Sequence, residues 1–175
     1  FNLKICCLTW NLFLVYWVSG TILDLDSDLL TSKQWTQCYS GTYADYLTSS
    51  VVSTILAQCN KAKLLLACKP VANSVYTLAA MGLRDDVLYD CGTSSTCTNV
   101  ANGVGWYFND DWSWGFVSGG DEVDRNSCDT ETANETARLC WHTGAGGGGG
   151  GYRCGSTIGL NSATTWERAI WHTDS

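Results

Sequence analysis

The chain has 175 residues and a mass of 19.0 kDa, which suffices for one domain with its own core but not comfortably for two. Its net charge of -7 and isoelectric point near 4.5 exclude nucleic acid as a partner, because few cations are present to neutralise phosphates. Ten cysteines are typical of a disulfide-rich extracellular protein. Their spacing lacks the paired C-x-x-C ligands of structural zinc sites, so we expect neither a metal nor a cofactor.

The N-terminal segment is uncharged from Ile5 to Leu23 and rich in aromatic and β-branched side chains. As an extended strand it would be mainly apolar on both faces, so both faces would need covering. A lone monomer would then expose more apolar surface than soluble proteins tolerate. We therefore interpret residues 1–30 as an apolar arm with a hinge, and residues 31–175 as a cysteine-rich globular domain. The residues expected to insert into a neighbouring copy are Leu3, Ile5, Leu8, Trp10, Leu12, Phe13, Leu14, Val15, Tyr16, Trp17, Val18, Ile22 and Leu23.

Three other interpretations of the arm remain open. Lys4, the apolar middle and the small residues Val18-Ser19-Gly20 fit a secretory signal with its cleavage site. The uncharged run is also long enough for a membrane span, and it is apolar enough to be a core element of its own domain. If the arm inserts into a neighbour, we expect no membrane contact in the assembled form.

The acidic segment that follows the arm resembles the start of a calcium-binding loop, with Asp24, Asp26 and Asp28 at alternate positions. It departs from the EF-hand pattern, because Leu29 stands where glycine is needed and Trp35 where the bidentate glutamate belongs. We interpret it as a solvated hinge that helps to cap a following helix.

Apolar residues recur at helical spacing over about residues 42–67, and Pro70, the only proline, ends this pattern. The sequence therefore predicts one long helix there. Short core strands are expected at 74–81 and 87–89, with a polar turn between them, and a final strand at 166–171.

Residues 87–154 combine cysteines, aromatic residues and glycines, which favours short strands and tight turns held by disulfides. Cys91 and Cys97 enclose a small loop and are expected to pair with each other. Six further cysteines allow 15 pairings, which the sequence does not distinguish; they are Cys38, Cys59, Cys68, Cys128, Cys140 and Cys154. The fold class expected overall is α+β, a disulfide-rich and mainly antiparallel β domain with one long helix and an extended N-terminal arm.

Several stretches together resemble a cysteine-rich domain found in secreted and cell-surface proteins of aquatic microbes. They include KAKLLLACKPV, AAMGLRDDVLYDCG, NGVGWYF, RLCWHT, GGYRCG and LNSATTWERAI, and they span roughly residues 35–172. The resemblance implies an extracellular module, sometimes repeated, that is suited to coats, adhesion or assembly and supplies no catalytic residue. The arm separately resembles pilus subunits that assemble by strand donation. Type IV pilins also begin with phenylalanine, but they carry a glutamate where this chain has Ile5.

The sequence offers no convincing catalytic group. His142 and His172 both stand in Trp-His-Thr contexts, where a packed histidine is more common than a general base. Acidic residues in the glycine-rich turns, such as Asp110-Asp111, are more often turn-forming than catalytic. The glycine run from Gly144 formally fits G-x-G-x-x-G, but no strand-then-helix context supports a nucleotide site. We therefore expect a protein that is not an enzyme.

Two functions remain as hypotheses. The first is a structural subunit of an extracellular, pilus-like appendage of the cell surface, in which each copy inserts its arm into the next. The alternative is a carbohydrate-binding module with glycans as partners and residues 1–23 as a signal or membrane anchor. Its candidate stacking residues are Trp112 and Trp114, with Trp106, Trp141 and Tyr152 as further candidates. Asn134-Glu135-Thr136 is an acceptor sequence for N-glycosylation at Asn134.

Overall fold

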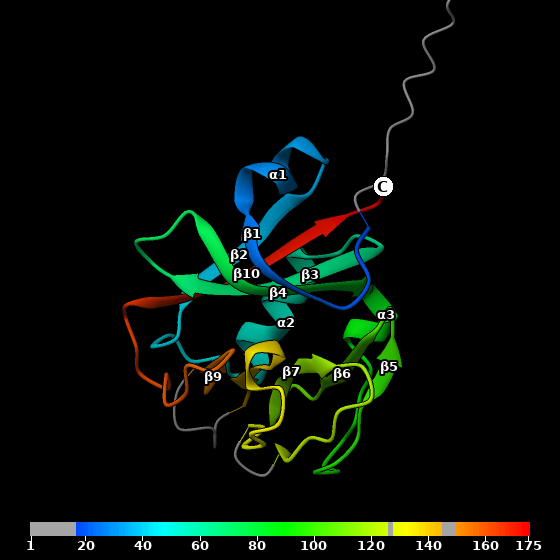
Figure 1. Ribbon diagram of the computed structural model, residues 1–175, viewed down its shortest axis with the longest axis vertical. Helices are drawn as coiled ribbons and strands as arrows, with labels where there is room; N and C mark the ends of the chain where they lie inside the picture. Colours follow the sequence, from blue (N-terminus) through cyan, green and yellow to red (C-terminus); the bar gives the residue numbers. More distant parts are fainter. Residues whose placement is uncertain (1–16, 126–127, 145–149) are drawn as a thin grey trace, which may run out of the picture.

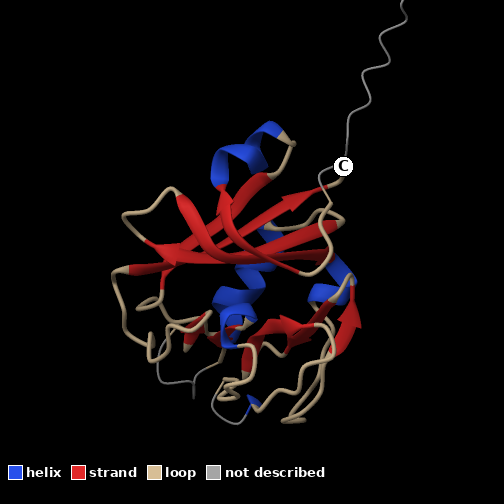
Figure 2. Ribbon diagram, in the orientation of Figure 1, coloured by secondary structure: helices blue, strands red, loops and turns tan. Residues whose placement is uncertain are grey.

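The computed structural model describes residues 17–125, 128–144 and 150–175, which form two antiparallel five-stranded sheets stacked on each other (Figures 1 and 2). In the first sheet the order is β1 (Thr21–Asp26), β4 (Val75–Leu83), β3 (Lys63–Pro70), β10 (Trp166–Thr173) and β2 (Thr36–Thr42). In the second sheet the order is β5 (Asn99–Ala101), β6 (Val104–Phe108), β7 (Ser113–Ser118), β8 (Leu139–His142) and β9 (Arg153–Cys154). The short helices are α1 (Ser27–Ser32), α2 (Ser49–Gln58), α3 (Arg84–Val87) and the 3-10 helix η2 (Glu135–Ala137).

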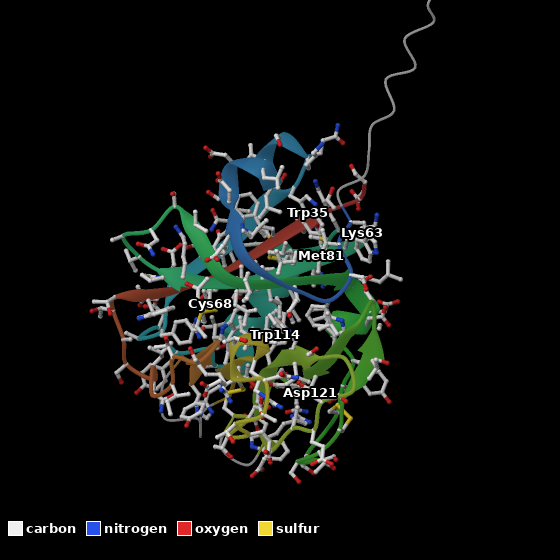
Figure 3. All side chains as sticks on the ribbon, in the orientation of Figure 1. Trp35, Lys63, Cys68, Met81, Trp114 and Asp121 are labelled. Carbon is white, nitrogen blue, oxygen red and sulfur yellow. A yellow bond between two sulfur atoms is a disulfide. The ribbon has the colours of Figure 1, made fainter. Side chains whose placement is uncertain are left out.

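The central strands of the first sheet are buried on both faces, which explains the nearly continuous apolar runs of β3 and β4. On β3, Leu64 and Leu66 belong to the core between the two sheets, together with α2. Leu65 and Ala67 belong to a second core on the opposite face, which α1 and Trp35 help to cover. Figure 3 shows Trp35 on this outer side of the first sheet, away from the second sheet.

Large aromatic side chains of the second sheet fill the space between the sheets. Trp106, Trp114, Trp141 and Phe116 are fully buried. The ring of Trp114 meets that of Trp141 edge to face at 5.5 Å between centroids, a favourable aromatic geometry. Cys68 and Trp114 both lie between the two layers (Figure 3).

The predicted long helix over residues 42–67 is wrong. Thr42 ends β2, α2 covers only Ser49–Gln58, and β3 begins at Lys63. Thr48 caps α2 by accepting a hydrogen bond from the Val51 N–H, and the Cys38–Cys59 disulfide joins the end of α2 to β2. The apolar run after Lys63 fits a helix or a buried strand equally well by its periodicity, and pairing on both sides makes it a central strand. The fold is therefore mainly β, with no long helix among the described residues.

Two other local expectations have different outcomes. The strand expected at 87–89 is also wrong, because Val87 ends α3. The strands expected at 74–81 and 166–171 correspond to β4 and β10.

Four disulfides hold the described domain together, so the protein is disulfide-rich. They join Cys38 to Cys59, Cys68 to Cys154, Cys91 to Cys97 and Cys128 to Cys140. Cys91 and Cys97 thus pair with each other, as their spacing suggested. This number of disulfides indicates an extracellular or secreted protein. Within the described ranges, no helix has the length and apolar character needed to cross a membrane.

Candidate functional site

The arm enters the domain through residues 17–20, which we call the root. Asn102 is the centre of its contacts. The Asn102 side-chain amide donates hydrogen bonds to the Val18 carbonyl (2.8 Å) and to the Met81 carbonyl of β4 (3.0 Å). The Asn102 carbonyl accepts from the Gly20 N–H (2.7 Å) and from the Ser19 hydroxyl (3.0 Å). The root is therefore tied to both sheets at once.

The turn that presents Asn102 is a two-residue hairpin connection between β5 and β6. Asn102 and Gly103 both have positive φ angles, 52° and 72°, as the Asn-Gly hairpin turn requires. A side chain at position 103 would also collide with the root, because an ideal Cβ there lies 2.8 Å from the Ser19 Oγ. Local turn chemistry thus places the amide that holds the root.

The root reaches the surface at the end of the first sheet where the C-terminal residue lies (Figure 1). The Trp17 ring is partly exposed, and the Lys63 ammonium lies 5.1 Å from its centroid. Lys63 also donates a hydrogen bond to the Ser175 carbonyl. The Val18 N–H points to the Met81 sulfur at 3.3 Å. Trp17 is consequently held beside a cation, and the next residue, Val18, packs against the outer core.

Only the last part of the predicted arm falls within the described residues. Ile22 and Leu23 belong to β1 and pair with Ala79 and Leu78 of β4, so they complete their own sheet. The remaining candidates lie outside the described residues; they are Leu3, Ile5, Leu8, Trp10, Leu12, Phe13, Leu14, Val15 and Tyr16. The segment expected to be a hinge continues β1, and the Asp26 carboxylate caps α1 by accepting from the Asp28 N–H (2.9 Å).

The candidate sugar-stacking residues differ in exposure. Trp114 is fully buried, as are Trp106 and Trp141, so none of the three presents a ring to a ligand. Trp112 is half-buried, and the Arg125 guanidinium lies 4.9 Å from its ring. Near this region, a pocket of about 410 Å³ has no aromatic lining residue; it is lined by Ser95, Thr96, Glu122, Val123, Asp124 and Glu131. The aromatic platform that sugar recognition requires is therefore not formed at Trp114.

The two histidines lie in different sheets, His142 at the end of β8 and His172 in β10. Burial lowers the pKa of each imidazole below its ordinary value. Among the residues that the structure describes, no three His, Cys, Asp or Glu side chains are grouped so that they would hold a metal ion. The charges of Lys61 and Arg84 also lower the pKa of His172, and the Asp174 carboxylate opposes them.

Asn134 is exposed at the start of η2 and has a left-handed backbone conformation with φ 48°. Its side-chain amide donates to the Asp121 carboxylate at 3.1 Å. Glycosylation at this nitrogen stays a prediction of the acceptor sequence.

Asn102 is not among the site residues predicted from the sequence, although its local sequence carries a usable signal. Asn-Gly between Val100-Ala101 and Val104 is a strong indication of a tight hairpin. What no local pattern shows is that this hairpin would lie against the root, since the two segments are far apart in sequence.

We expect Asn102→Gly to loosen the root while leaving the hairpin intact, because glycine accepts the positive φ angle but lacks the amide. Loss of the two side-chain hydrogen bonds should lower the free energy of unfolding by about 1–3 kcal/mol. Hydrogen exchange of the Gly20 amide should accelerate. Asn99→Gly in neighbouring β5 is the control, because the Asn99 amide donates to Asp86 and not to the root. Unchanged Gly20 exchange in Asn102→Gly would contradict this assignment.

Comparison with known proteins gives no relative for this chain: no protein-family model, no curated protein and no solved structure matches it.

Proposed function

We propose that the protein is a structural subunit of an extracellular filament, in which residues 1–16 of each copy insert into the next. The observation that carries the proposal is the anchored root, which joins an apolar segment to a complete two-sheet domain at a fixed surface point. The donor is limited to residues 1–16, because Ile22 and Leu23 are already paired with their own β4.

The donor segment suits strand addition in length and composition. Residues 1–16 contain one charged side chain, Lys4, and are otherwise apolar or neutral. Fully extended, such a segment spans roughly 50 Å, longer than any strand of the domain. Main-chain hydrogen bonds along an added strand supply affinity, and apolar burial contributes about 25 cal/mol per Å² before the costs of association.

The geometry of such a contact favours a fibre. Donor and acceptor surfaces differ, so the interface is heterologous and repeats indefinitely unless the rotation closes a ring. A domain with four disulfides is suited to permanent structure outside the cell, because it stays folded where chaperones are absent. A surface appendage is the setting that combines these properties.

The test is electron microscopy of the full chain without detergent, beside a variant that lacks residues 1–16. We expect regular fibres from the full chain and dispersed monomers with an unchanged melting temperature from the variant. The deletion stops at residue 16 because a longer one would remove the root and β1. A second variant, with residues 1–16 replaced by a Gly/Ser segment of equal length, controls for chain length. Fibres that persist in both variants, or a full chain that stays monomeric, would overturn the proposal.

A further inference from the structure

An inserted strand needs an unpaired sheet edge, and the two sheets have four edge strands, β1, β2, β5 and β9. Edge strands present free N–H and C=O groups, and proteins usually protect them with charges, bulges, short length or a covering segment. The four edges differ in this protection.

Three of the edges are protected. β1 carries the charged residues Asp24 and Asp26, Asp24 has a positive φ of 53°, and η2 lies against this strand. β5 has three residues and β9 has two. Cys154 of β9 is also bridged to Thr157 of the following turn. None of these edges offers a long, regular row of free backbone groups.

β2 is different, because its seven residues, Thr36–Thr42, include neither a charge nor a proline. In an antiparallel pair, successive residues alternate between bonding to the partner strand and pointing their backbone groups away. The Tyr43 N–H donates to the Trp166 carbonyl of the β10 segment (3.0 Å), which fixes this alternation. Thr42 and Ser40 therefore point their backbone groups away from β10.

The two outward residues differ in what they contact. The Thr42 N–H donates to the Asp45 carboxylate (2.6 Å), and the Thr42 carbonyl accepts from the Arg168 side chain (2.8 Å). Both outward backbone groups of Thr42 therefore already have hydrogen-bond partners. Ser40 is exposed, and none of the described residues forms a hydrogen bond with its N–H or C=O. The register with β10 shifts at Cys38, which marks a bulge within the strand. This edge is thus open at Ser40, and the bulge at Cys38 is its one interruption within residues 36–40.

We infer that residues 1–16 of a second copy add to the outer edge of β2 over residues 36–40. This inference rests on the proposed function and names its acceptor. At the β2 edge, Cys38 and Tyr39 pack against the core between the sheets, while the other residues of the strand are polar or glycine. An added strand with apolar side chains on the same face as Cys38 or Tyr39 extends that core outward, and the donor sequence is mainly apolar on either side.

The path of the chain favours a second copy over the same copy as the source of the added strand. The root and the start of β2 lie at the same end of the first sheet, since Lys63 pairs with Thr173 and Thr36 pairs with His172. The C-terminal residues lie between them. The Ser175 hydroxyl donates to the Gln34 side chain (2.8 Å), and its carbonyl accepts from Lys63. If the arm paired with β2 of the same copy, it would have to cross these contacts of Ser175 with Gln34 and Lys63.

The first experiment uses two full-length copies with different tags, co-expressed, one of which carries a photoreactive phenylalanine in place of Phe13. We expect cross-linked species that contain both tags, with the cross-link mapped to residues 36–40 of the second copy. Cross-links confined to single copies would overturn the inference. If fibres form but the cross-links map to another edge strand, β2 is not the acceptor, and the proposed function stands. Absence of both fibres and two-tag species would overturn both.

The second experiment compares Ser40→Pro with Ser40→Ala in the full chain. Proline removes only an outward-facing N–H, so pairing with β10 is kept, whereas alanine retains that N–H. We expect Ser40→Pro to raise the critical concentration for fibre assembly at least about tenfold, with Ser40→Ala unchanged. Equal assembly of the two variants would overturn the inference. If Ser40→Pro does not fold, as judged by its circular dichroism, the cross-link map decides.

Discussion

Replacing both Cys68 and Cys154 with alanine is expected to lower the free energy of unfolding by about 4–5 kcal/mol. This disulfide closes a long stretch of chain, with a sequence separation of 86 residues, and it links β3 of the first sheet to β9 of the second. Without it the unfolded chain gains the entropy of a large open loop. For a domain of this size we expect the melting temperature to fall by roughly 10–20 °C.

The matched control is the double replacement of Cys91 and Cys97, which are separated by only 6 residues. The same loop-entropy relation gives about 2 kcal/mol for this pair. Chemical denaturation under non-reducing conditions measures both variants against the parent. Equal losses for the two pairs, or a larger loss for the short loop, would contradict the view that Cys68–Cys154 is the main covalent tie between the sheets.

Asp129→Asn is expected to destabilise the fold by about 3–5 kcal/mol, because it leaves the buried Arg138 guanidinium without its counter-charge. The Asp129 carboxylate accepts two hydrogen bonds from Arg138 Nη1, at 2.9 and 3.1 Å, and both side chains are almost completely buried. Asparagine keeps the size of the side chain and tolerates the positive φ of 52° at this position. The substitution therefore removes the charge with little other change.

Asp121→Asn serves as the control for this prediction, because the Asp121 carboxylate also lies near Arg138. It is 3.8 Å from Nη2 and its side chain is 21% exposed. Water screens such a contact, so we expect a loss below about 1 kcal/mol. Denaturant unfolding of the two variants measures both losses of stability. If Asp129→Asn lowers the free energy of unfolding as little as Asp121→Asn does, the prediction is wrong, and nearby carbonyls suffice as partners for Arg138. Those partners are the carbonyls of Ala133 and Glu122.

The final strand was predicted correctly at 166–171, and the structure forms β10 over Trp166–Thr173. Its sequence does not alternate strictly, because Ala169, Ile170 and Trp171 are consecutive and all buried, as expected of a strand that is covered on both faces. The helix over 42–67 failed because apolar periodicity alone does not separate a helix from a buried central strand. In such a run the partner strands decide, and β4 and β10 come from distant parts of the chain.

The side-chain roles were harder to predict than the strands. A tryptophan in a glycine-rich β segment fits either a ligand platform or a core, and burial between the sheets assigns Trp114 to the core. Asn102 anchors the root, and Arg168 occupies the outward carbonyl of Thr42. Both contacts join residues that are more than 80 positions apart in the sequence. No spacing rule contains such information, because it follows from how the two sheets stack.

The root also determines how the domain bears tension. A pull on residues 1–16 reaches β1 through the root, and antiparallel backbone hydrogen bonds join β1 to β4. The Asn102 contacts divert part of the load to the second sheet, and the Cys68–Cys154 bond returns it to the first through a covalent path. Detaching β1 from its N-terminal end therefore requires the root contacts to break first, so the root protects the edge of the first sheet against a strand being peeled away.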